Sequence, residues 1–462
     1  MRTKKLTSCT GCWELKSKMT VPTTTETEKA NTLQGYEYFA NQIMYELSFK
    51  TLRDTEEILI YQNGIYKKGG ESYIKEKCQK IIPNCSTNKA KEVINIIKRT
   101  TYVTREEFDT NPNYLNLENG ILNLTTGKLQ EHSPKYLFRI QLPVKYQEGV
   151  VPTKFNEFLK SSLPDEENRT NAMEAFASTL LLDLKLEKMI MNVGEGANGK
   201  STFLSVIEHF LGSENVSNTS IHDLLYNQFA KSRLDGKMAN IYSDISRREL
   251  PELGSVKALI SGDTLDVERK HQNEFKLKNT AKMIFSCNEL PEIGEESHAV
   301  YRRLLLVQWS QKFTHDGENK IKPNLLKELT TKNEISGILN ELIIVTKRLR
   351  ENGKFTNGSN SSDLQRIWSL KSDPIGKFLD SNVAQDFVSK MPKVKLFNEF
   401  QNWCKNNRIT PKSEKAFNVK VKETFGISPT TLRIEQKPTK VWQGLKIMED
   451  VTSETAGAAI SS

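Results

Sequence analysis

The residues best suited to chemistry lie in the segment NVGEGANGKSTF, residues 192–203. After Gly194 come four residues and then Gly199, Lys200 and Ser201, in the spacing G-x-x-x-x-G-K-[ST]. Small residues in such a loop let backbone N–H groups converge on phosphate oxygens at a helix N-terminus. The spacing predicts a nucleotide-binding loop, in which Lys200 reaches the β- and γ-phosphates and Ser201 holds Mg²⁺. The residues expected to bind ATP are Gly194, Glu195, Gly196, Ala197, Asn198, Gly199, Lys200, Ser201 and Thr202.

The flanking segments predict the structure that this loop needs. The apolar run MIMNV (189–193) is short enough to be a buried parallel strand that leads into the loop. After the loop, Phe203, Ile207 and Phe210 fall on one face of a helix that ends at Gly212. Strand, glycine-rich loop and helix in this order separate the motif from a chance match.

An acidic residue on a neighbouring strand is the next requirement of a P-loop enzyme, because Mg²⁺ or the attacking water needs a carboxylate. The segment MANIYSDIS (238–246) reads as an apolar strand ending at Asp244. An aspartate after a strand is commonly only a turn residue. In combination with the loop, Asp244 is the best candidate for the carboxylate that binds Mg²⁺.

Two further segments follow within 254–293. LDVERKH and FKLKN are predicted to form a hairpin whose turn presents Lys270 and His271. KMIFSCN reads as another buried strand, which ends in the polar Asn288. Asparagine at a strand end is commonly a turn former. In an ATPase, Asn288 could instead orient the attacking water or sense the γ-phosphate.

Arg302 and Arg303 stand immediately before the apolar strand of the segment AVYRRLLLVQW (299–309). An arginine at this place is either a salt bridge at the rim of the sheet or an arginine finger. A finger would reach into the ATP of a neighbouring subunit and accelerate hydrolysis by orders of magnitude.

The whole chain is predicted to be a soluble, cytoplasmic protein without a membrane segment. Its 462 residues suggest two to four domains, and no apolar run approaches the roughly 20 residues that cross a bilayer. The start of the chain lacks the apolar stretch of a secretory signal. Six cysteines are too few and too scattered for a disulfide framework. Cys9 and Cys12 could form half of a zinc site, but two free thiols are the favoured interpretation.

Composition and hydrophobic periodicity divide the chain into six segments. Net charge is +9, and residues 371–450 alone carry 15 Lys and Arg against 9 Asp and Glu, a surplus compatible with a polyanionic partner. The predicted segments are a flexible tail with the C-x-x-C pair (1–28), a small α+β domain (29–150), an α/β core (151–330), a helix and linker (331–363), a winged-helix-like domain (364–447) and a disordered tail (448–462).

The order of these motifs resembles that of the superfamily 3 helicases, specifically the phage, plasmid and poxvirus-type primase-helicase family. The motifs that carry the resemblance are GEGANGKST, NIYSD, KALISGDTLDVERKH, KMIFSCNELP and YRRLLLVQW, all within residues 194–309. Upstream, FDTNPNYLNLENGILNLTTGKLQEHSP (108–134) is similar to the domain that precedes the helicase in this family. The resemblance covers roughly residues 35–447 and extends to the winged-helix-like region.

The resemblance implies an AAA+-type ATPase that assembles as a ring, a hexamer, and hydrolyses ATP with Mg²⁺ between its subunits. Such a helicase translocates 3′ to 5′ on single-stranded DNA during replication of a virus, plasmid or other mobile element. By matching position, Gly194 to Ser201 would be Walker A and Asp244 Walker B, and Asn288 would be sensor 1. Lys270 and His271 would lie on the DNA-tracking hairpin, and Arg302 or Arg303 would be the finger.

This sequence departs from the family pattern at two places. Ser243 precedes a lone Asp244 where two adjacent acids are common, so either Asp244 serves both metal and base roles, or Glu249 or another residue assists it. Residues 1–28 are too short for the primase domain of many relatives, so a separate primase is expected.

Two other functions stay open, a DNA-stimulated ATPase that melts or remodels duplex origin DNA and a non-catalytic DNA-binding initiator. A small-molecule P-loop kinase would leave the basic C-terminal region unexplained.

Overall fold

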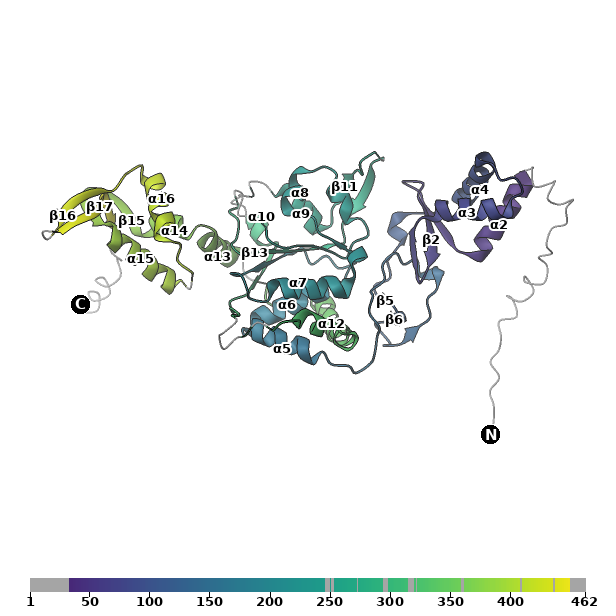
Figure 1. The fold of residues 1–462 in the computed structure, drawn as a ribbon, viewed down its shortest axis with the longest axis horizontal. Coiled ribbons are helices and arrows are strands. Elements are labelled where there is room, and N and C mark those ends of the chain that lie inside the picture. Colours follow the sequence, from purple (N-terminus) through teal and green to yellow (C-terminus); the bar gives the residue numbers. More distant parts are fainter. Residues whose placement is uncertain are drawn as a thin grey trace, which may run out of the picture. The chain divides into compact units, whose positions relative to one another are not determined.

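The computed structural model describes residues 33–245, 250, 253–271, 273–293, 298–314, 320, 322–358, 361–407, 409–434 and 437–448. The described residues form two compact units, divided between Tyr146 and Gln147. Figure 1 labels the elements of both. The N-terminal tail with Cys9 and Cys12, the end of the C-terminal tail and the possible helper Glu249 lie outside the described residues. Among the described helices, none is both long enough and apolar enough to span a membrane.

The first unit is a mixed α+β structure with two antiparallel-rich sheets. Its elements are α2 (Leu33–Glu46), β1 (Phe49–Leu52), β2 (Ile58–Gln62), β3 (Ile65–Lys68), α3 (Gly70–Ile81), α4 (Thr87–Thr100), β4 (Tyr102–Val103), β5 (Tyr114–Leu117), β6 (Gly120–Asn123) and β7 (Leu129–Gln130). The strand orders are β3-β2-β1-β4 and β5-β6-β7. Asn63 and Gly64 have φ of 52° and 90°, as expected of a two-residue hairpin turn. Asn63-Gly64 between the two β-rich runs of 58–68 predicts this hairpin, and the antiparallel pairing of β2 with β3 confirms it.

The second unit contains a five-stranded parallel sheet. Its elements up to the linker are α5 (Thr153–Ser162), α6 (Glu166–Ser178), β8 (Met189–Val193), α7 (Lys200–Leu211), β9 (Val216–Ser217), α8 (Ile221–Tyr226), β10 (Ala239–Tyr242), α9 (Gly254–Ser261), β11 (Thr264–Val267), β12 (Phe275–Lys278), β13 (Lys282–Cys287), α10 (His298–Tyr301), β14 (Leu304–Gln308), α11 (Leu325–Leu329) and α12 (Lys332–Asn352). The strand order is β14-β8-β13-β10-β9, and each pair is parallel. The predicted α/β architecture with a parallel sheet is confirmed.

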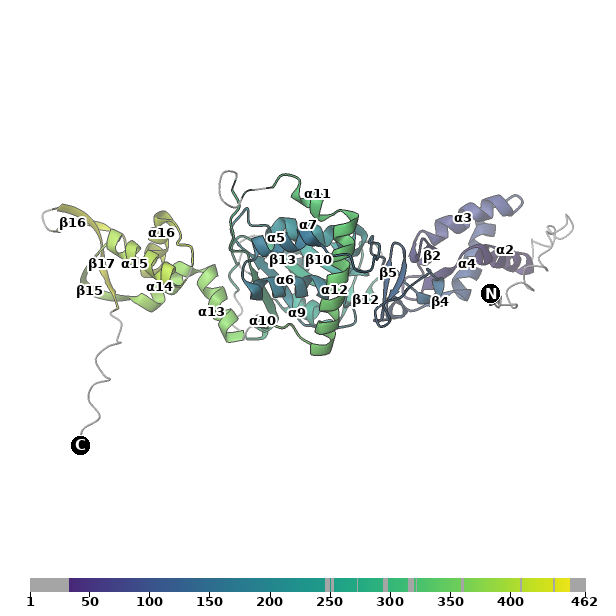
Figure 2. The ribbon, with the colours of Figure 1, turned by 90° about the horizontal axis from the view of Figure 1, so that it is seen from below.

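Helices cover both faces of this sheet, so its central strands are largely buried. All five residues of β8 are buried, as expected of a strand between two layers. Figure 1 shows α5, α6, α7 and α12 on one side of the sheet and α8, α9 and the β11–β12 hairpin on the other, and Figure 2 shows the long α12 running beside α5, α6 and α7. On the first side, the rings of Phe155, Phe176, Phe203, Phe210 and Trp309 form one aromatic cluster.

The C-terminal part of the second unit adds a small domain with its own hydrophobic core. Its elements are α13 (Ser361–Ser372), α14 (Pro374–Asn382), β15 (Val383–Pro392), α15 (Lys393–Asn406), α16 (Glu414–Phe425), β16 (Thr430–Ile434) and β17 (Lys437–Ile447). The strands form an antiparallel sheet in the order β15-β17-β16. The helical spacing of Leu396, Phe400 and Trp403 predicts a helix there, and the sequence predicts a second helix near 413–424 and two strands within 431–447. The structure confirms them as α15, α16, β16 and β17.

The predicted linker over 351–363 is packed in part. Phe355 is buried, and the backbone N–H of Thr356 donates to Glu174 of α6 at 2.8 Å. Leu364 and Trp368 of α13 belong to the hydrophobic core of the parallel-sheet region. The helix that follows the linker therefore packs on the parallel-sheet region rather than on the antiparallel C-terminal sheet.

Candidate functional site

The loop of residues 194–199 connects β8 to α7, as the motif predicts. A side chain cannot replace the hydrogen of Gly194, because a Cβ atom there would lie 2.3 Å from the carbonyl oxygen of Trp309. Gly199 has a φ of +95°, and its added Cβ would lie 2.8 Å from Oγ of Ser162. Both glycines are therefore required by the backbone path, one by close approach and one by conformation.

Lys200 is the first residue of α7 and is buried. Its Nζ donates to the carbonyl oxygen of Gly194, to Oδ1 of Asn198 at 3.2 Å and to Oδ1 of Asn288 at 3.4 Å. Burial lowers the pKa of Lys200, while the nearby Cys287 and Asp244 oppose that shift. Lys200 is thus an ammonium group held among neutral oxygens, which favours an anionic ligand.

The strand order brings Asp244 and Asn288 to the same edge of the sheet as the loop. β13 pairs with β8 on one side and with β10 on the other. Asn288 directly follows β13, and Asp244 stands two residues beyond β10 with a φ of 66°. Both residues are exposed. Because parallel strands end at one edge, Lys200, Asp244 and Asn288 gather there, outside the carboxyl ends of the strands.

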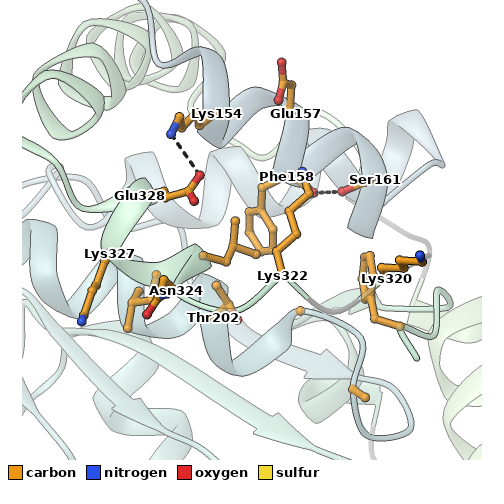
Figure 3. Close-up of a pocket in the computed structure, with 15 residues that line it drawn as sticks. Lys154, Glu157, Phe158, Ser161, Thr202, Lys320, Lys322, Asn324, Lys327 and Glu328 are labelled. Carbon is orange, nitrogen blue, oxygen red and sulfur yellow. Dashed lines mark hydrogen bonds and ion pairs between the residues drawn. The ribbon is translucent and has the colours of Figure 1, made fainter. Parts of the chain in front are cut away.

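A pocket of about 570 Å³ adjoins the loop. Its walls come from α5, from the loop and the start of α7, and from Phe313, Lys320, Lys322 and residues 324–328. Figure 3 shows Phe158 between the Lys154–Glu328 ion pair on one side and Lys320 on the other. Its lining residues are Lys154, Glu157, Phe158, Ser161, Ala197, Gly199, Thr202, Phe313, Lys320, Lys322, Asn324, Leu325, Leu326, Lys327 and Glu328.

The sequence did not reveal the pocket wall that follows β14. The backbone N–H of Phe313 donates to the carbonyl oxygen of Ala197 at 2.8 Å, and that of Trp309 donates to Val193 at 2.8 Å. These bonds hold residues 309–313 alongside the loop. The segment has no periodicity and no motif, so no sequence signal could have placed it there.

Other predicted loop residues differ in exposure. Glu195, Gly196 and Ala197 are exposed, and a Cβ at Gly196 would meet nothing within 4 Å. Asn198 is buried, and its Nδ2 donates to the carbonyl oxygens of Glu195 and Trp309. The loop is therefore pinned by Asn198 while its tip stays open to a ligand.

Ser201 and Asp244 supply the oxygens that a magnesium ion prefers. Both residues are exposed, and the Asp244 carboxylate lies close enough to affect the pKa of Lys200. In the part of the chain that the structure describes, no three His, Cys, Asp or Glu residues cluster as metal ligands. Magnesium commonly takes one or two protein oxygens and completes its shell with phosphates and waters. The residues present fit that ion.

Arg302 and Arg303 lie at the opposite edge of the sheet. The backbone N–H of Met189, the first residue of β8, donates to the carbonyl oxygen of Arg303 at 2.6 Å. The guanidinium of Arg303 is engaged within the subunit, with Nε and Nη2 donating to Oγ of Ser261 and Nη1 to the carbonyl oxygen of Ala299. Arg302 is exposed. The two arginines, which the sequence could not distinguish, therefore differ in the structure: Arg303 is hydrogen-bonded within the subunit and Arg302 is exposed.

Lys270 and His271 stand in the turn of the β11–β12 hairpin, and both are exposed. Arg269 fixes the base of this turn, since its Nη2 pairs with Asp235 at 2.7 Å and its guanidinium lies 4.8 Å from the ring centre of Phe275. The predicted hairpin is confirmed, and its turn presents Lys270 and His271 to solvent.

Two family models match the chain. One is described as "D5 N terminal like" and matches residues 14–164. The other is described as "Family of unknown function (DUF5906)" and matches residues 192–303, which hold the loop, Asp244, the hairpin and Asn288. The second model therefore coincides with the candidate site.

The curated relatives are viral proteins of low identity. "Putative helicase L207/L206" of Acanthamoeba polyphaga mimivirus is 23% identical over 221 residues, 46% of this chain and 23% of that protein. "Putative primase C962R" of African swine fever virus (isolate Warthog/Namibia/Wart80/1980) is 22% identical over 239 residues, 48% of this chain and 25% of that protein. "Putative helicase 121R" of Invertebrate iridescent virus 3 is 20% identical over 334 residues, 65% of this chain and 36% of that protein. The match thus spans about a quarter to a third of these relatives' lengths.

A solved structure shares the fold over most of the chain. "The A form apo structure of NrS-1 C terminal region-CTR" aligns with a TM-score of 0.50 at 12% identity, covering 88% of this chain and 98% of that chain. This likeness concerns the fold alone. The D5 N terminal like match and the viral relatives confirm the predicted resemblance of this chain to the phage and viral primase-helicase family.

Proposed function

We propose that the chain is an ATP-dependent DNA helicase of superfamily 3, with an AAA+-type P-loop core that forms a ring on single-stranded DNA during replication of a virus, plasmid or other mobile element. The observation that carries the proposal is the meeting of Lys200, Asp244 and Asn288 beside a 570 Å³ pocket. The names of the viral relatives support a replication role.

ATP binding follows from the electrostatics of the loop. Lys200 is a buried cation whose present partners are neutral oxygens, so phosphate oxygens would be better ligands. The N–H groups at the start of α7 add the positive end of the helix dipole. A magnesium ion held by Ser201 and Asp244 would neutralise the β- and γ-phosphates. The pocket beside the loop, with Phe158 and Phe313, then receives the nucleoside.

Hydrolysis needs a positioned water and charge stabilisation. Asn288 has an exposed side chain next to Lys200 and is the group we assign to orienting the water or sensing the γ-phosphate. Asp244 is the carboxylate we assign to the metal, and to the base role as well. Since the neighbouring Ser243 carries no charge, no second acid stands directly beside it.

A ring explains the position of the arginines. Strand β8 has five residues, which span about 17 Å, so Arg302 stands a strand length away from the loop of its own subunit. Its exposed side chain would instead reach the ATP of a neighbouring subunit, as an arginine finger does. Arg303, bound to Ser261, positions the turn that carries Arg302.

DNA contacts are assigned to the hairpin and to the C-terminal domain. Lys270 and His271 would contact the phosphate backbone of the single strand without reading bases. The C-terminal order of helix, strand, two helices and two strands fits a winged helix, and its basic surplus would serve duplex origin DNA. A separate primase, a hexameric ring and a cytoplasmic location stay predictions.

The deciding experiment measures ATP hydrolysis and fork unwinding by the purified chain with Mg²⁺. Lys200→Ala should lose both activities, whereas Lys270→Ala should keep hydrolysis and lose unwinding. Lys276→Ala, an exposed lysine on the flank of the same hairpin, is the matched control and should keep both.

Two other outcomes would redirect the proposal. Hydrolysis without strand separation on either polarity of tail would favour a DNA-stimulated ATPase that remodels an origin. No hydrolysis, with DNA present, would leave a non-catalytic initiator that acts through its C-terminal domain.

A further inference from the structure

Strand β15 carries two adjacent apolar side chains that are almost fully in water. Phe387 is 93% exposed and Val388 is 87% exposed. They stand at an interruption of the β15–β17 pairing, where the register shifts between Gln385 and Lys390. Exposing such side chains forgoes the free energy that burial of apolar surface contributes. A pair of this kind is therefore suited to a partner.

The turn that presents Phe387 is held by specific hydrogen bonds. Oδ1 of Asp386 accepts the backbone N–H of Val388 at 3.3 Å, and its Oδ2 accepts the hydroxyl of Ser389 at 2.8 Å. Nζ of Lys446, on the paired strand, lies 3.8 Å from the same carboxylate. These contacts fix the backbone on both sides of Phe387, so the ring is presented in water by an organised turn.

The sheet that carries this turn is strongly basic. Across the described residues of β15, β16, β17 and the first turn of α15, the only acidic residue is Asp386, which is already engaged. The basic residues there are Lys390, Lys393, Lys395, Arg433, Lys437, Lys440 and Lys446. An exposed aromatic ring within a positive surface is the combination that binds nucleic acid by stacking and backbone attraction.

We infer that Phe387 is a stacking platform for an unpaired nucleobase of DNA, with the surrounding lysines on the adjacent phosphates. A single strand is the favoured form, because bases in a duplex already stack on each other and would have to be unstacked before one could stack on the ring. The inference rests on the proposed function in one respect, that the polyanion bound by this chain is DNA. It adds a site that is independent of the Lys270 hairpin and of ATP.

The test measures affinity of the full chain for a fluorescent oligothymidylate by anisotropy, without nucleotide. Phe387→Ala should bind about five- to a hundredfold more weakly. Phe387→Trp should restore binding, because indole also stacks, whereas Phe387→Leu should not. Ile344→Ser, which removes an apolar side chain of 71% exposure from α12, is the matched control and should bind like the wild type. On an oligonucleotide of abasic sites, wild type and Phe387→Ala should bind equally.

Three results would overturn this inference. They are equal affinity of wild type and Phe387→Ala for oligothymidylate, full rescue by leucine, and a loss that persists on abasic DNA. A change of sedimentation coefficient in Phe387→Ala without a change in DNA affinity would assign the turn to contact between copies of the chain. Lys200-dependent hydrolysis, measured on the same samples, would show whether the proposed ATPase stands when the Phe387 site fails.

Discussion

The two edges of the core sheet both gather positive charge, yet they hold it differently. At the carboxyl edge, Lys200 is buried among the oxygens of Gly194, Asn198 and Asn288, next to a large pocket. At the amino edge, Nζ of Lys188 donates to the carbonyl oxygens of Arg302 and Leu304, at 2.6 and 3.1 Å. There the ammonium group fastens one backbone segment to another.

The comparison indicates that the hydrogen-bond partners of a buried lysine decide whether it binds a ligand or stabilises the backbone. A buried cation whose hydrogen-bond partners are all neutral oxygens can gain an anionic ligand. A cation whose donors are used by main-chain carbonyls instead stiffens a turn. At the amino edge, the turn so stiffened is the one that presents Arg302. On the proposed function, the carboxyl edge is the one that binds ATP, and the amino edge is the one whose Arg302 reaches the neighbouring subunit.

The largest expected effect belongs to Arg302. Arg302→Ala should lower ATP hydrolysis by about 10³-fold or more while nucleotide binding is kept, because a finger acts on the charge of the transition state. Steady-state hydrolysis and nucleotide titration measure the two quantities. Mixing Arg302→Ala with Lys200→Ala should recover part of the activity, since mixed rings contain interfaces with both native residues. A mixture as inactive as its components would contradict a finger that acts between subunits.

The next effect concerns Asn288 at the carboxyl edge. Asn288→Ala should lower kcat by about 10²-fold with little change in KM, because it removes a polar group directed at the reacting phosphate. Ser243→Ala is the control: it alters the exposed neighbour of Asp244 and should leave kcat unchanged. A rise in KM with kcat unchanged would reassign Asn288 to substrate binding.

Arg303→Ala should act on stability more than on chemistry. Removal of its guanidinium leaves Oγ of Ser261 and the carbonyl of Ala299 without these donors, which should lower the free energy of unfolding by about 1–3 kcal/mol. Arg302→Ala is the matched control, because its exposed side chain should leave the melting temperature unchanged. Equal melting temperatures for the two variants would show that Arg303 has no positioning role.

The smallest effect concerns Lys282 at the amino edge. Burial lowers the pKa of Lys282 to about 8 from its usual 10.5, partly offset by Asp183. Since the unfolded chain holds the proton up to about pH 10.5, stability should rise with pH from about 8 to 10.5. Lys282→Met should remove this rise. It should also increase the free energy of unfolding at pH 7 by about 1–2 kcal/mol, a net value that includes the loss of the hydrogen bond from Nζ to the carbonyl oxygen of Leu184.

Denaturant unfolding at pH 7 and pH 9.5 measures this difference. The exposed Lys278→Met is the control and should keep the pH dependence of the wild type. If Lys282→Met unfolds with the same pH dependence as the wild type, another group carries it.

Local signals in the sequence were sufficient where one short segment contains all the information. Asn63 and Gly64 predicted a hairpin because both tolerate positive φ. The C-terminal α14 and β15 were not predicted. For β15 the reason is that it has a single buried residue, Val383, and a register shift in its pairing with β17, so its sequence shows no alternation of apolar and polar residues. The pocket wall at Phe313 was missed for a related reason, because its hydrogen bond to Ala197 joins segments more than a hundred residues apart.

The sequence by itself determined which residues could do chemistry: a glycine-spaced loop, a lone aspartate, an asparagine after a strand and paired arginines before one. Their types and spacing are local properties of the chain. Only the tertiary structure decided which of them meet. The crossover that places β13 between β8 and β10 brings Asn288 to Lys200. The hydrogen bond to Ser261 engages the guanidinium of Arg303, whereas the side chain of Arg302 is exposed. Such pairings depend on the order of strands in the sheet, and spacing along the chain does not encode that order.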